Sequence, residues 1–441
     1  MLEIAVLLVF VAGLCICLSM GASILWALAA GYVIFCGYGW IRGYRVGQLL
    51  RMSFNGVKTV KNILVLFTLI GVITALWRAA GTIPVIVFWA SSLIRPSAFL
   101  LITFLLNCLV SVLTGTSFGT GATMGVICMA MANAMGVSPF YTGGAILSGI
   151  YFGDRCSPVS SSANLVCVLT GTDIFDNMRG MIRTSLIPLA LSCVIYYVVG
   201  QVIPASGNAM EVETLFAGSF CLHAAAVLPA AAILILSAFK INVKKTMAVS
   251  IGLAVLLCLF LQSFSLPQVV KMAIFGYRAP TPELAEMMDG GGLVSMIRVA
   301  VIVSLSSSYA GIFEGTGLLN SIRNRIAALS RRITVFGGVL VVSVITSMIA
   351  CNQTLAIMLT HQLCRDTEPD AGQFALDLEN TAVVISPLIP WSIAGAVPLA
   401  AVGAPVSSMM VACYLYLLPL CQLAVRVWRE KRKLPRKGMQ E

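Results

Sequence analysis

Gly149-Ile-Tyr-Phe-Gly-Asp-Arg-Cys-Ser-Pro-Val-Ser-Ser-Ser-Ala-Asn164 is a polar stretch in an otherwise apolar chain. It follows an uncharged run, residues 96–153, that is long enough for more than two membrane crossings at about 20 residues per helix. Asp154 and Arg155 then place an acid and a base side by side, and Pro158 and four serines follow. A helix break with many hydroxyls inside an apolar region is typical of the broken helices at transporter binding sites. We therefore take this stretch as the centre of the molecule.

The composition of the rest of the chain is that of a membrane protein. Of its 441 residues, 59% are hydrophobic and 10% are charged, whereas roughly a quarter of the residues in a soluble domain are charged. Runs without Asp, Glu, Lys or Arg recur at residues 4–41, 79–94, 96–153, 184–210, 214–239, 246–270, 333–364 and 380–425. At about 20 residues per span, with shorter helices where a span is broken, these runs predict an all-α polytopic protein with about 11–13 transmembrane segments.

The net charge of +11 is explained by the loops between membrane helices. The basic residues lie in short segments between the apolar runs and in the tail at residues 426–437, which is the positive-inside pattern. This distribution predicts a multi-pass protein of the cell (inner) membrane with both termini in the cytoplasm. The lipid bilayer is the expected partner, no nucleic-acid partner is expected, and the sequence leaves an oligomer open.

A weak internal repeat relates the two halves of the chain at a spacing of about 232 residues. The matching elements, in order, are Ser111-Val-Leu-Thr114 with Ser343-Val-Ile-Thr346, Asp154 with Glu379, and Ser157-Pro158 with Ser386-Pro387. Two halves with broken segments in corresponding places are typical of transporters built from inverted repeats, with broken helices or re-entrant hairpins at the site. We predict N-terminal helices and an inside loop at 1–61, a first repeat at 62–204, connecting helices at 205–290, a second repeat at 291–428 and a basic cytoplasmic tail at 429–441.

Several other functional classes lack their sequence signatures. No GxxxxGK[ST] phosphate loop occurs, which argues against an ATP-driven pump. With two histidines and no CxxC pair, no zinc spacing can be assembled, and no cofactor is expected. An intramembrane enzyme would need a Ser/His or metal constellation, and a passive channel does not need paired broken repeats. The sequence therefore favours a secondary transporter over an enzyme.

Asp154 is the first candidate for an ion site. An ionisable group inside a membrane span is costly and usually functional, although a structural acid paired with Arg155 would give the same sequence pattern. A carboxylate among hydroxyls and freed carbonyls suits a hard cation, and it can equally take a proton. We predict Asp154 and Ser157 as Na+ ligands, with Ser160 and Asn164 as further neutral oxygen ligands. Arg155 either neutralises Asp154 or supplies the counter-charge when no cation is bound.

Glu379 and Glu314 are candidates for secondary charges. Glu379 precedes a polar pair and a Ser-Pro break, and Glu314 closes a long uncharged run and is followed by glycines. Each is either a functional charge within the membrane or an ordinary surface charge, in an aqueous loop for Glu379 and at a helix end for Glu314. The sequence leaves both alternatives open.

Polar residues also lie at the predicted breaks. The glycines of residues 114–125 have GxxxG spacing, which favours close helix packing over a phosphate loop. Thr116 and Ser117 nonetheless place hydroxyls beside this unwound segment. Asn352 and Gln353 occupy the matching position in the second half, where they either bind a polar substrate or cap a broken helix. All four residues are candidate ion- or substrate-binding residues.

These motifs resemble the NhaC-type Na+/H+ antiporter family of the ion transporter superfamily. The resemblance rests on GTSxGTxxTMG at 115–125, GDRxSPxS at 153–160, Asn164-Leu165, TGTD at 170–173, Leu378-Glu379 and Ser386-Pro-Leu-Ile-Pro-Trp391. It covers most of the chain in the same order. It implies a bundle of inverted repeats that exchanges Na+ for H+, with related members exchanging organic acids or amino acids as well.

Two positions depart from the pattern of the family that the chain resembles. Ser161 and Asn380 stand where that family usually carries an acid, so each change removes a formal negative charge near the expected site. A cation site depends on carboxylates. The loss of two acids therefore weakens the expectation of simple Na+/H+ exchange and favours a neutral or anionic co-substrate.

The sequence supports two hypotheses. In the first, the protein is a secondary antiporter in which Na+ and H+ compete for Asp154, Glu379 and Glu314 act as secondary charges, and alternating access moves one half against the other. In the second, it is a Na+- or H+-coupled transporter or exchanger of an organic acid or amino acid. Arg155 and the two amides of the second-half break would then hold the small organic solute.

Overall fold

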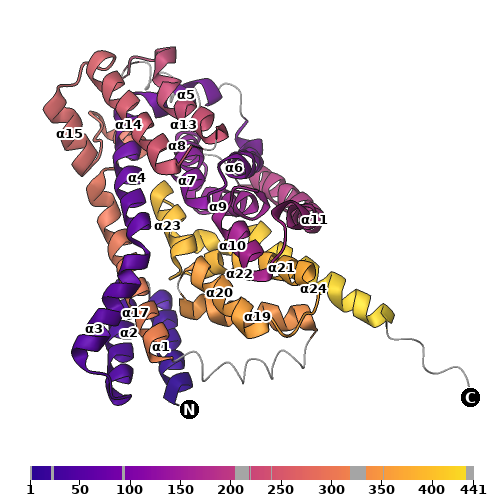
Figure 1. The fold of residues 1–441 in the computed structure, drawn as a ribbon. Coiled ribbons are helices and arrows are strands. Elements are labelled where there is room, and N and C mark those ends of the chain that lie inside the picture. The colour runs from indigo at the N-terminus through magenta and orange to yellow at the C-terminus, as the bar shows by residue number, and fades with distance from the viewer. Residues whose placement is uncertain are drawn as a thin grey trace, which may run out of the picture.

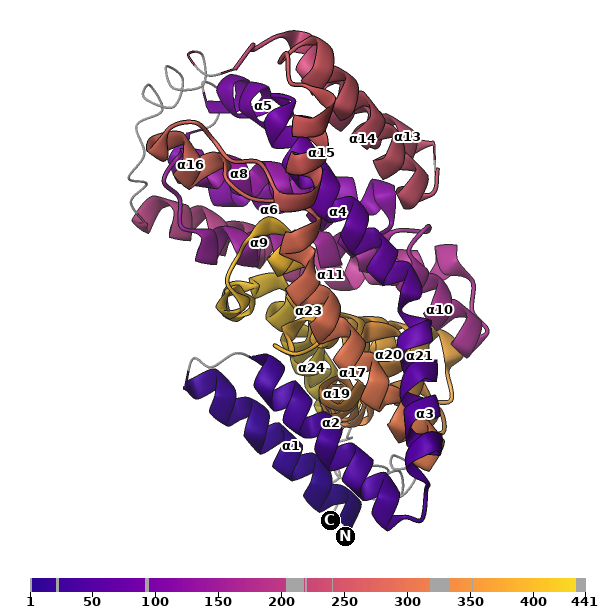
Figure 2. The same ribbon diagram turned by 90° about the vertical axis from the view of Figure 1, so that its left-hand side faces the viewer.

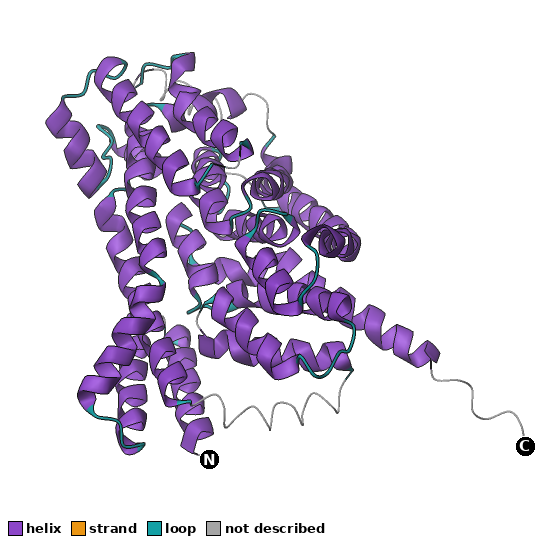
Figure 3. Cartoon of the chain, viewed as in Figure 1, coloured by secondary structure: helices purple, strands orange, loops and turns teal. Residues whose placement is uncertain are grey.

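The protein is helical throughout the part of the chain that the structure describes. The computed structural model describes residues 2–20, 24–91, 95–203, 218, 220–239, 241–317, 334–350 and 352–433. Within these ranges the β-structure is limited to one isolated bridge between Tyr277 and Gly290, and Figure 3 shows helices joined by short loops. The predicted all-α fold is confirmed.

The helices form two groups, a limb and a body (Figure 1). The limb runs along one side and contains α1 (Leu2–Ser19), α2 (Ile24–Ile41), α3 (Val46–Thr59), α4 (Lys61–Ala79), α13 (Leu228–Ala238), α14 (Val243–Phe260), α15 (Leu266–Phe275) and α17 (Ile297–Thr316). The body contains α6 (Phe99–Thr114), α7 (Ser117–Thr120), α8 (Val126–Ala134), α9 (Pro139–Cys156), α10 (Ser161–Thr170), α11 (Ile174–Val202), α19 (Val335–Ala350), α20 (Gln353–Cys364), α21 (Ala371–Asn380), α22 (Ala382–Ile385), α23 (Ile393–Val402) and α24 (Cys413–Lys433). Helix α5 (Thr82–Ser91) continues from α4 and packs on α8, and α16 (Pro282–Met288) also packs on α8.

Several described helices are long and apolar enough to cross a membrane. They are the single spans Pro96–Thr114, Ile174–Val202 and Leu293–Phe313 and two bent pairs, Leu64–Ala79 with Thr82–Trp89 at 64° and Ala371–Leu388 with Ile393–Val402 at 54°. The bent pairs agree with the prediction of broken helices in both halves. Shorter apolar helices lie between them, and the total of 11–13 segments stays a prediction.

The helix breaks have local causes in the sequence. Helix α6 ends because Gly115 adopts a left-handed conformation with φ +65°, which glycine reaches without steric cost. Helix α9 ends at Cys156 because Pro158 disfavours helical geometry in the residue before it, and Ser157 is extended at φ −98° and ψ 133°. The proline therefore ends α9 shortly after Asp154, so that Asp154 lies in the last turn of its helix.

The two halves place equivalent elements in the same order around their breaks. In the first half, Thr116 Oγ1 caps α7 by accepting from the Gly119 N–H at 2.8 Å. In the second half, Asn352 Oδ1 caps α20 by accepting from the Leu355 N–H at 2.8 Å. Such caps satisfy backbone donors that a helix start leaves free. The equivalence supports the predicted repeat, while the domain boundaries remain predictions.

Hydrogen bonds and packing join the two halves within the body. Helix α10 packs on α21, and α11 packs on α24. Tyr151 of α9 donates from its hydroxyl to the Ala394 carbonyl of α23 at 2.7 Å. The limb meets the body where α17 packs on α23, and Figure 2 shows the limb in front of the body along this boundary.

Candidate functional site

Asp154 is buried near the C-terminal end of α9. Three side chains donate hydrogen bonds to its carboxylate. Ser160 Oγ reaches Oδ1 at 3.1 Å, Ser162 Oγ reaches Oδ2 at 3.1 Å, and Gln353 Nε2 reaches Oδ2 at 3.3 Å. Gln353 comes from the second half of the chain, so the two halves meet at this carboxylate.

Close packing sets the position of Asp154 relative to the neighbouring helix α6. A Cβ atom on Gly153 would collide with the side chain and backbone of Ser111 in α6, and one on Gly149 would collide with Asn107 and the Phe104 carbonyl. Only glycine allows α9 to approach α6 this closely. The two glycines therefore hold the C-terminal turn of α9 against α6.

The loop after α9 brings hydroxyls back to Asp154. Ser160 is the N-cap of α10, and its Oγ accepts from the Ala163 N–H at 3.3 Å while it donates to Asp154. Ser162 Oγ lies 2.8 Å from Ser160 Oγ. The carboxylate and the two hydroxyls form a compact group of oxygens of the kind that hard cations bind.

The structure does not bring two of the predicted ligands to the carboxylate. Ser157 Oγ donates to the Val112 carbonyl at 2.6 Å and so satisfies the backbone of α6. Asn164 is exposed and donates to the carbonyls of Pro158 and Ser160 at 3.1 and 2.6 Å. Both residues shape the loop instead. Ser162, which the sequence analysis did not single out, contacts the carboxylate instead of Ser157. Its position two residues after the predicted ligand Ser160 is the feature of the sequence that could have identified it.

Arg155 does not pair with Asp154. Its buried guanidinium points the other way, toward α11 and α21. It donates to Asn380 Oδ1 at 2.6 Å, Thr184 Oγ1 at 2.7 Å, Ser185 Oγ at 2.5 Å and the Met181 carbonyl at 3.0 Å. Arg155 therefore links the first half of the chain to Asn380 in the second half. Asn380 is one of the two positions where an acid was expected from the family pattern.

Glu379 is fully buried next to this link, near the end of α21. Within the described part of the chain, neither of its carboxylate oxygens has a hydrogen-bond partner. Arg155 and Asp154 are the charged groups that act on it electrostatically. Glu379 is therefore a buried acid and not a residue of an aqueous loop, which was the alternative that the sequence left open. Glu314 lies in α17, and its side chain is outside the part of the chain that the structure describes.

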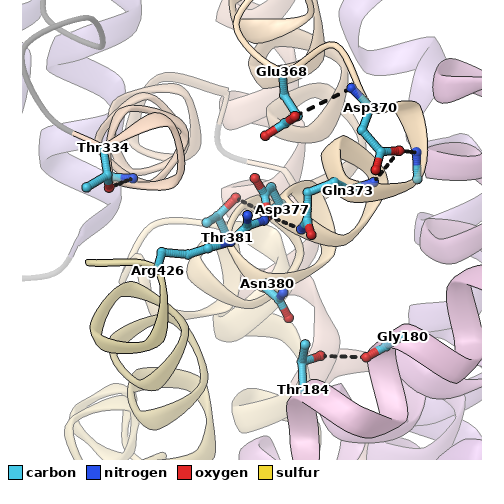
Figure 4. A network of polar contacts seen from close by, with 12 residues as sticks. Gly180, Thr184, Thr334, Glu368, Asp370, Gln373, Asp377, Asn380, Thr381 and Arg426 are labelled. Atoms are coloured by element: carbon cyan, nitrogen blue, oxygen red, sulfur yellow. Dashed lines mark hydrogen bonds and ion pairs between the residues drawn. The ribbon is translucent and has the colours of Figure 1, made fainter. Parts of the chain in front are cut away.

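A second buried acid on α21 is paired with the C-terminal helix (Figure 4). Asp377 is 1% exposed, and its Oδ1 accepts from Arg426 Nη2 of α24 at 2.8 Å and from Gln373 Nε2 at 2.9 Å. Asp377 Oδ2 has no partner in the described part of the chain. The pair ties α24 to the helix that carries Glu379.

A cavity of about 720 Å³ opens beside Asp154 at the boundary of body and limb. From the body, the candidate residues Thr116, Ser117, Asn352 and Gln353 line it together with Asp154. The remaining lining residues are Met52, Asn55, Gly56, Val60, Phe118, Ser161, Gly311, Gly315, Thr354, Leu355, Met358, Ile393 and Ala394. Five of the sequence-predicted site residues therefore share one cavity, whereas Arg155 and Glu379 lie outside its lining.

Asp154 is the only acidic or basic residue that lines this cavity in the described part of the chain. Among the described residues no three His, Cys, Asp or Glu side chains gather as a metal centre would. A cation in this cavity would therefore rest on one carboxylate and neutral oxygens.

A family model matches the part of the chain that contains this site. The model described as "Na+/H+ antiporter family" covers residues 149–427, which include Asp154, Arg155, Glu379 and the Asp377–Arg426 pair.

Known proteins of three activities align with most of the chain. The Na+/H+ antiporter NhaC of Alkalihalophilus pseudofirmus is 26% identical over 85% of this chain and 85% of its own length. The arginine/ornithine antiporter ArcD of Halobacterium salinarum is 27% identical over 93% of this chain and 87% of its own length. The malate-2H+/Na+-lactate antiporter of Bacillus subtilis is 24% identical over 79% of this chain and 77% of its own length.

Proposed function

The chain belongs to the Na+/H+ antiporter family, and from this premise we propose that it exchanges Na+ for H+ at Asp154 by alternating access. It is a secondary antiporter of the NhaC type and a multi-pass membrane protein. The observation that carries the proposal is a single buried carboxylate that lines a cavity and is surrounded by hydroxyls at a helix break. Ionisable groups in such positions are rare in membrane proteins and mark ion pathways.

Na+ and H+ would use Asp154 in turn. When Na+ binds, the carboxylate and the hydroxyl oxygens of Ser160 and Ser162 supply oxygen ligands, because hard cations prefer oxygen. When a proton binds, the carboxyl group is neutral and the hydroxyls keep their hydrogen bonds. One negative charge cannot hold both cations at once in a buried site. Because the two ions compete for one carboxylate, transport of one is coupled to transport of the other, and no further charged group has to move.

Arg155 and Glu379 would balance charge without touching the ion. Both are buried, and neither lines the cavity. The Arg155 guanidinium keeps its contacts to Asn380 and α11 whichever ion occupies Asp154. Its positive charge offsets the negative charge of the two nearby acids, which lowers the cost of burying them. Their role is therefore positioning and charge compensation.

The moving unit in this mechanism is the body. The contacts from Arg155 to Asn380, Gln353 to Asp154 and Tyr151 to Ala394 join its two halves, so one half does not slide freely against the other. The cavity lies instead between body and limb. Movement of the body along α3 and α17 would expose Asp154 to each side of the membrane in turn. We place the protein in the cell (inner) membrane with both termini in the cytoplasm, as the basic loops predict.

The experiment is sodium-driven proton movement in proteoliposomes that contain the purified full-length protein and an internal pH dye. Addition of Na+ outside is expected to make the lumen alkaline, because Na+ enters as H+ leaves. Choline at the same ionic strength serves as the control. Equal responses to Na+ and choline would refute Na+/H+ exchange.

A second candidate function is Na+- or H+-coupled exchange of an organic solute. The cavity volume favours it, because about 720 Å³ lies within the range of roughly 300–1,000 Å³ typical of small-molecule sites. The names of two relatives, an arginine/ornithine and a malate/lactate antiporter, also fit this class. Asn352 and Gln353 line the cavity as this hypothesis requires, whereas Arg155 does not. Proton movement that needs an added organic solute would favour this candidate.

A further inference from the structure

Two oxygens from opposite halves of the chain converge on one amide nitrogen beside the cavity. Gln353 Nε2 donates to Asp154 Oδ2 at 3.3 Å and to the Val383 carbonyl at 3.1 Å. We propose that Na+ binds between these two oxygens, in the place of the amide group, with the Val383 carbonyl as a ligand from the second half. This inference rests on the proposed function, because it adds a ligand to the Na+ site at Asp154.

The Val383 carbonyl is available because a proline stands four residues after it. In an α-helix a carbonyl accepts from the N–H group four residues later, and Pro387 occupies that position without an N–H group. The neighbouring Ser386 N–H donates to the Ala382 carbonyl. The Val383 carbonyl accepts from the side chain of Gln353 instead. Carbonyls freed in this way at the broken helices of transporters are suited to coordinate Na+.

Counted from the helix break, Val383 occupies in the second half the position that Asp154 occupies in the first. Each residue lies four positions before the proline of its break, which is Pro158 or Pro387. In the first half the corresponding carbonyl, that of Asp154, accepts from Ser162 Oγ at 3.2 Å. In the second half the side chain is apolar, so the backbone oxygen is what this position offers to an ion. The two breaks therefore bring a carboxylate and a carbonyl to one point.

The amide group of Gln353 occupies the position that a cation would take. A carboxylate and a carbonyl both accept hydrogen bonds, so the donor side of the amide faces them. Hard cations bind the same kinds of oxygen. Three side chains donate to Asp154, and among the described lining residues Gln353 is the one of the three that lines the cavity. An ion that enters from the cavity therefore meets this amide first and displaces it.

The exchange of amide for ion keeps the two halves of the body joined. Without Na+, the Gln353 side chain bridges Asp154 and Val383. With Na+, the ion itself bridges the same two oxygens. A proton on Asp154 leaves Gln353 in place, because a carboxyl group keeps an acceptor oxygen. The body therefore moves as one unit in both states, as the proposed mechanism requires.

The test is equilibrium binding of Na+ to the purified full-length protein in detergent, measured by calorimetry at alkaline pH, where protons compete least. Gln353→Met keeps the length of the side chain and removes the competing amide. The Kd for Na+ should fall about tenfold, since the ion-free carboxylate loses a hydrogen bond. Pro387→Ala supplies an N–H group four residues after Val383. The Kd for Na+ should rise about tenfold, since this N–H competes with the ion for the carbonyl.

Each variant has a matched control outside the cavity lining. Gln373→Met removes an amide donor from Asp377, and Pro419→Ala restores an N–H group inside α24. Both controls should leave the Kd for Na+ unchanged. Unchanged or weaker Na+ binding in Gln353→Met would overturn the placement of Na+, and this variant decides even if Pro387→Ala does not fold. Unchanged or tighter binding in a folded Pro387→Ala would overturn the Val383 carbonyl as a ligand.

The outcomes also separate this inference from the proposed Na+/H+ exchange. Sodium-driven proton movement in the wild-type protein, with wild-type Na+ affinity in both variants, would overturn this site and leave exchange at Asp154 standing. The two opposite shifts in Kd, in a protein that shows no sodium-driven proton movement, would support the site and overturn the exchange. A general loss of stability would not move the two Kd values in opposite directions.

Discussion

Replacement of Ser162 by alanine tests which hydroxyls belong to the ion site. Ser162 Oγ donates to Asp154 Oδ2 at 3.1 Å and is not a helix cap, so Ser162→Ala removes one oxygen ligand together with its 2.8 Å contact to Ser160 Oγ. A hydrogen bond to a charged group contributes about 1.5–3 kcal/mol, and 1.4 kcal/mol corresponds to a tenfold change in affinity. We expect the apparent KM for Na+ to rise about tenfold, near the lower limit, because Ser160 remains.

The measurement is the Na+ dependence of proton movement in proteoliposomes at constant pH. Ser157→Ala is the matched control, because Ser157 Oγ donates to the Val112 carbonyl and not to Asp154. This control should lower stability by about 1 kcal/mol in thermal unfolding and leave the KM for Na+ unchanged. The reasoning fails if Ser157→Ala raises the KM as much as Ser162→Ala does, or if Ser162→Ala leaves the KM as it was.

Three further substitutions test the packing around the site by thermal unfolding in detergent. Arg155→Lys keeps the charge but loses the guanidinium contacts to several acceptors, and should lower stability by about 2 kcal/mol or more, whereas no loss would show that the charge alone matters. Arg426→Met leaves the buried Asp377 without its cationic partner and should cost about 3 kcal/mol, most of which Asp377→Asn should restore in the double variant. Gly153→Ala should cost about 1–3 kcal/mol because its Cβ would collide with α6. Gly252→Ala in α14, where a Cβ meets nothing within 4 Å, should instead raise stability by up to about 1 kcal/mol, because alanine is the better helix former.

The architecture was largely predictable because the bilayer imposes long apolar runs on the sequence. Pro158 and Gly115 marked two helix breaks through their own backbone preferences. The division into limb and body was not predictable, since it depends on which apolar faces pack together. Helix α17, which follows the connecting helices in sequence, packs on α3 of the N-terminal segment.

The site was predictable in its central acid but not in the direction of its side chains. Asp154 was identified because a charge in an apolar run is costly. Sequence adjacency suggested that Arg155 pairs with it, yet neighbouring residues of a helix point about 100° apart, and Arg155 reaches Asn380 instead. The same limit applies to Ser157 and Ser162, because the loop after α9 decides which hydroxyl turns toward the carboxylate.

The measurement that tests the central claim most directly is sodium-driven alkalinisation of proteoliposomes carrying Asp154→Asn beside the wild-type protein. In the wild-type protein, Na+ and H+ compete for one carboxylate, so the apparent KM for Na+ should rise as the pH falls. Asp154→Asn keeps the size of the side chain and removes its charge, and should show no sodium-driven proton movement at any pH. Proton movement at the wild-type rate in Asp154→Asn would contradict the assignment of Asp154 as the shared site.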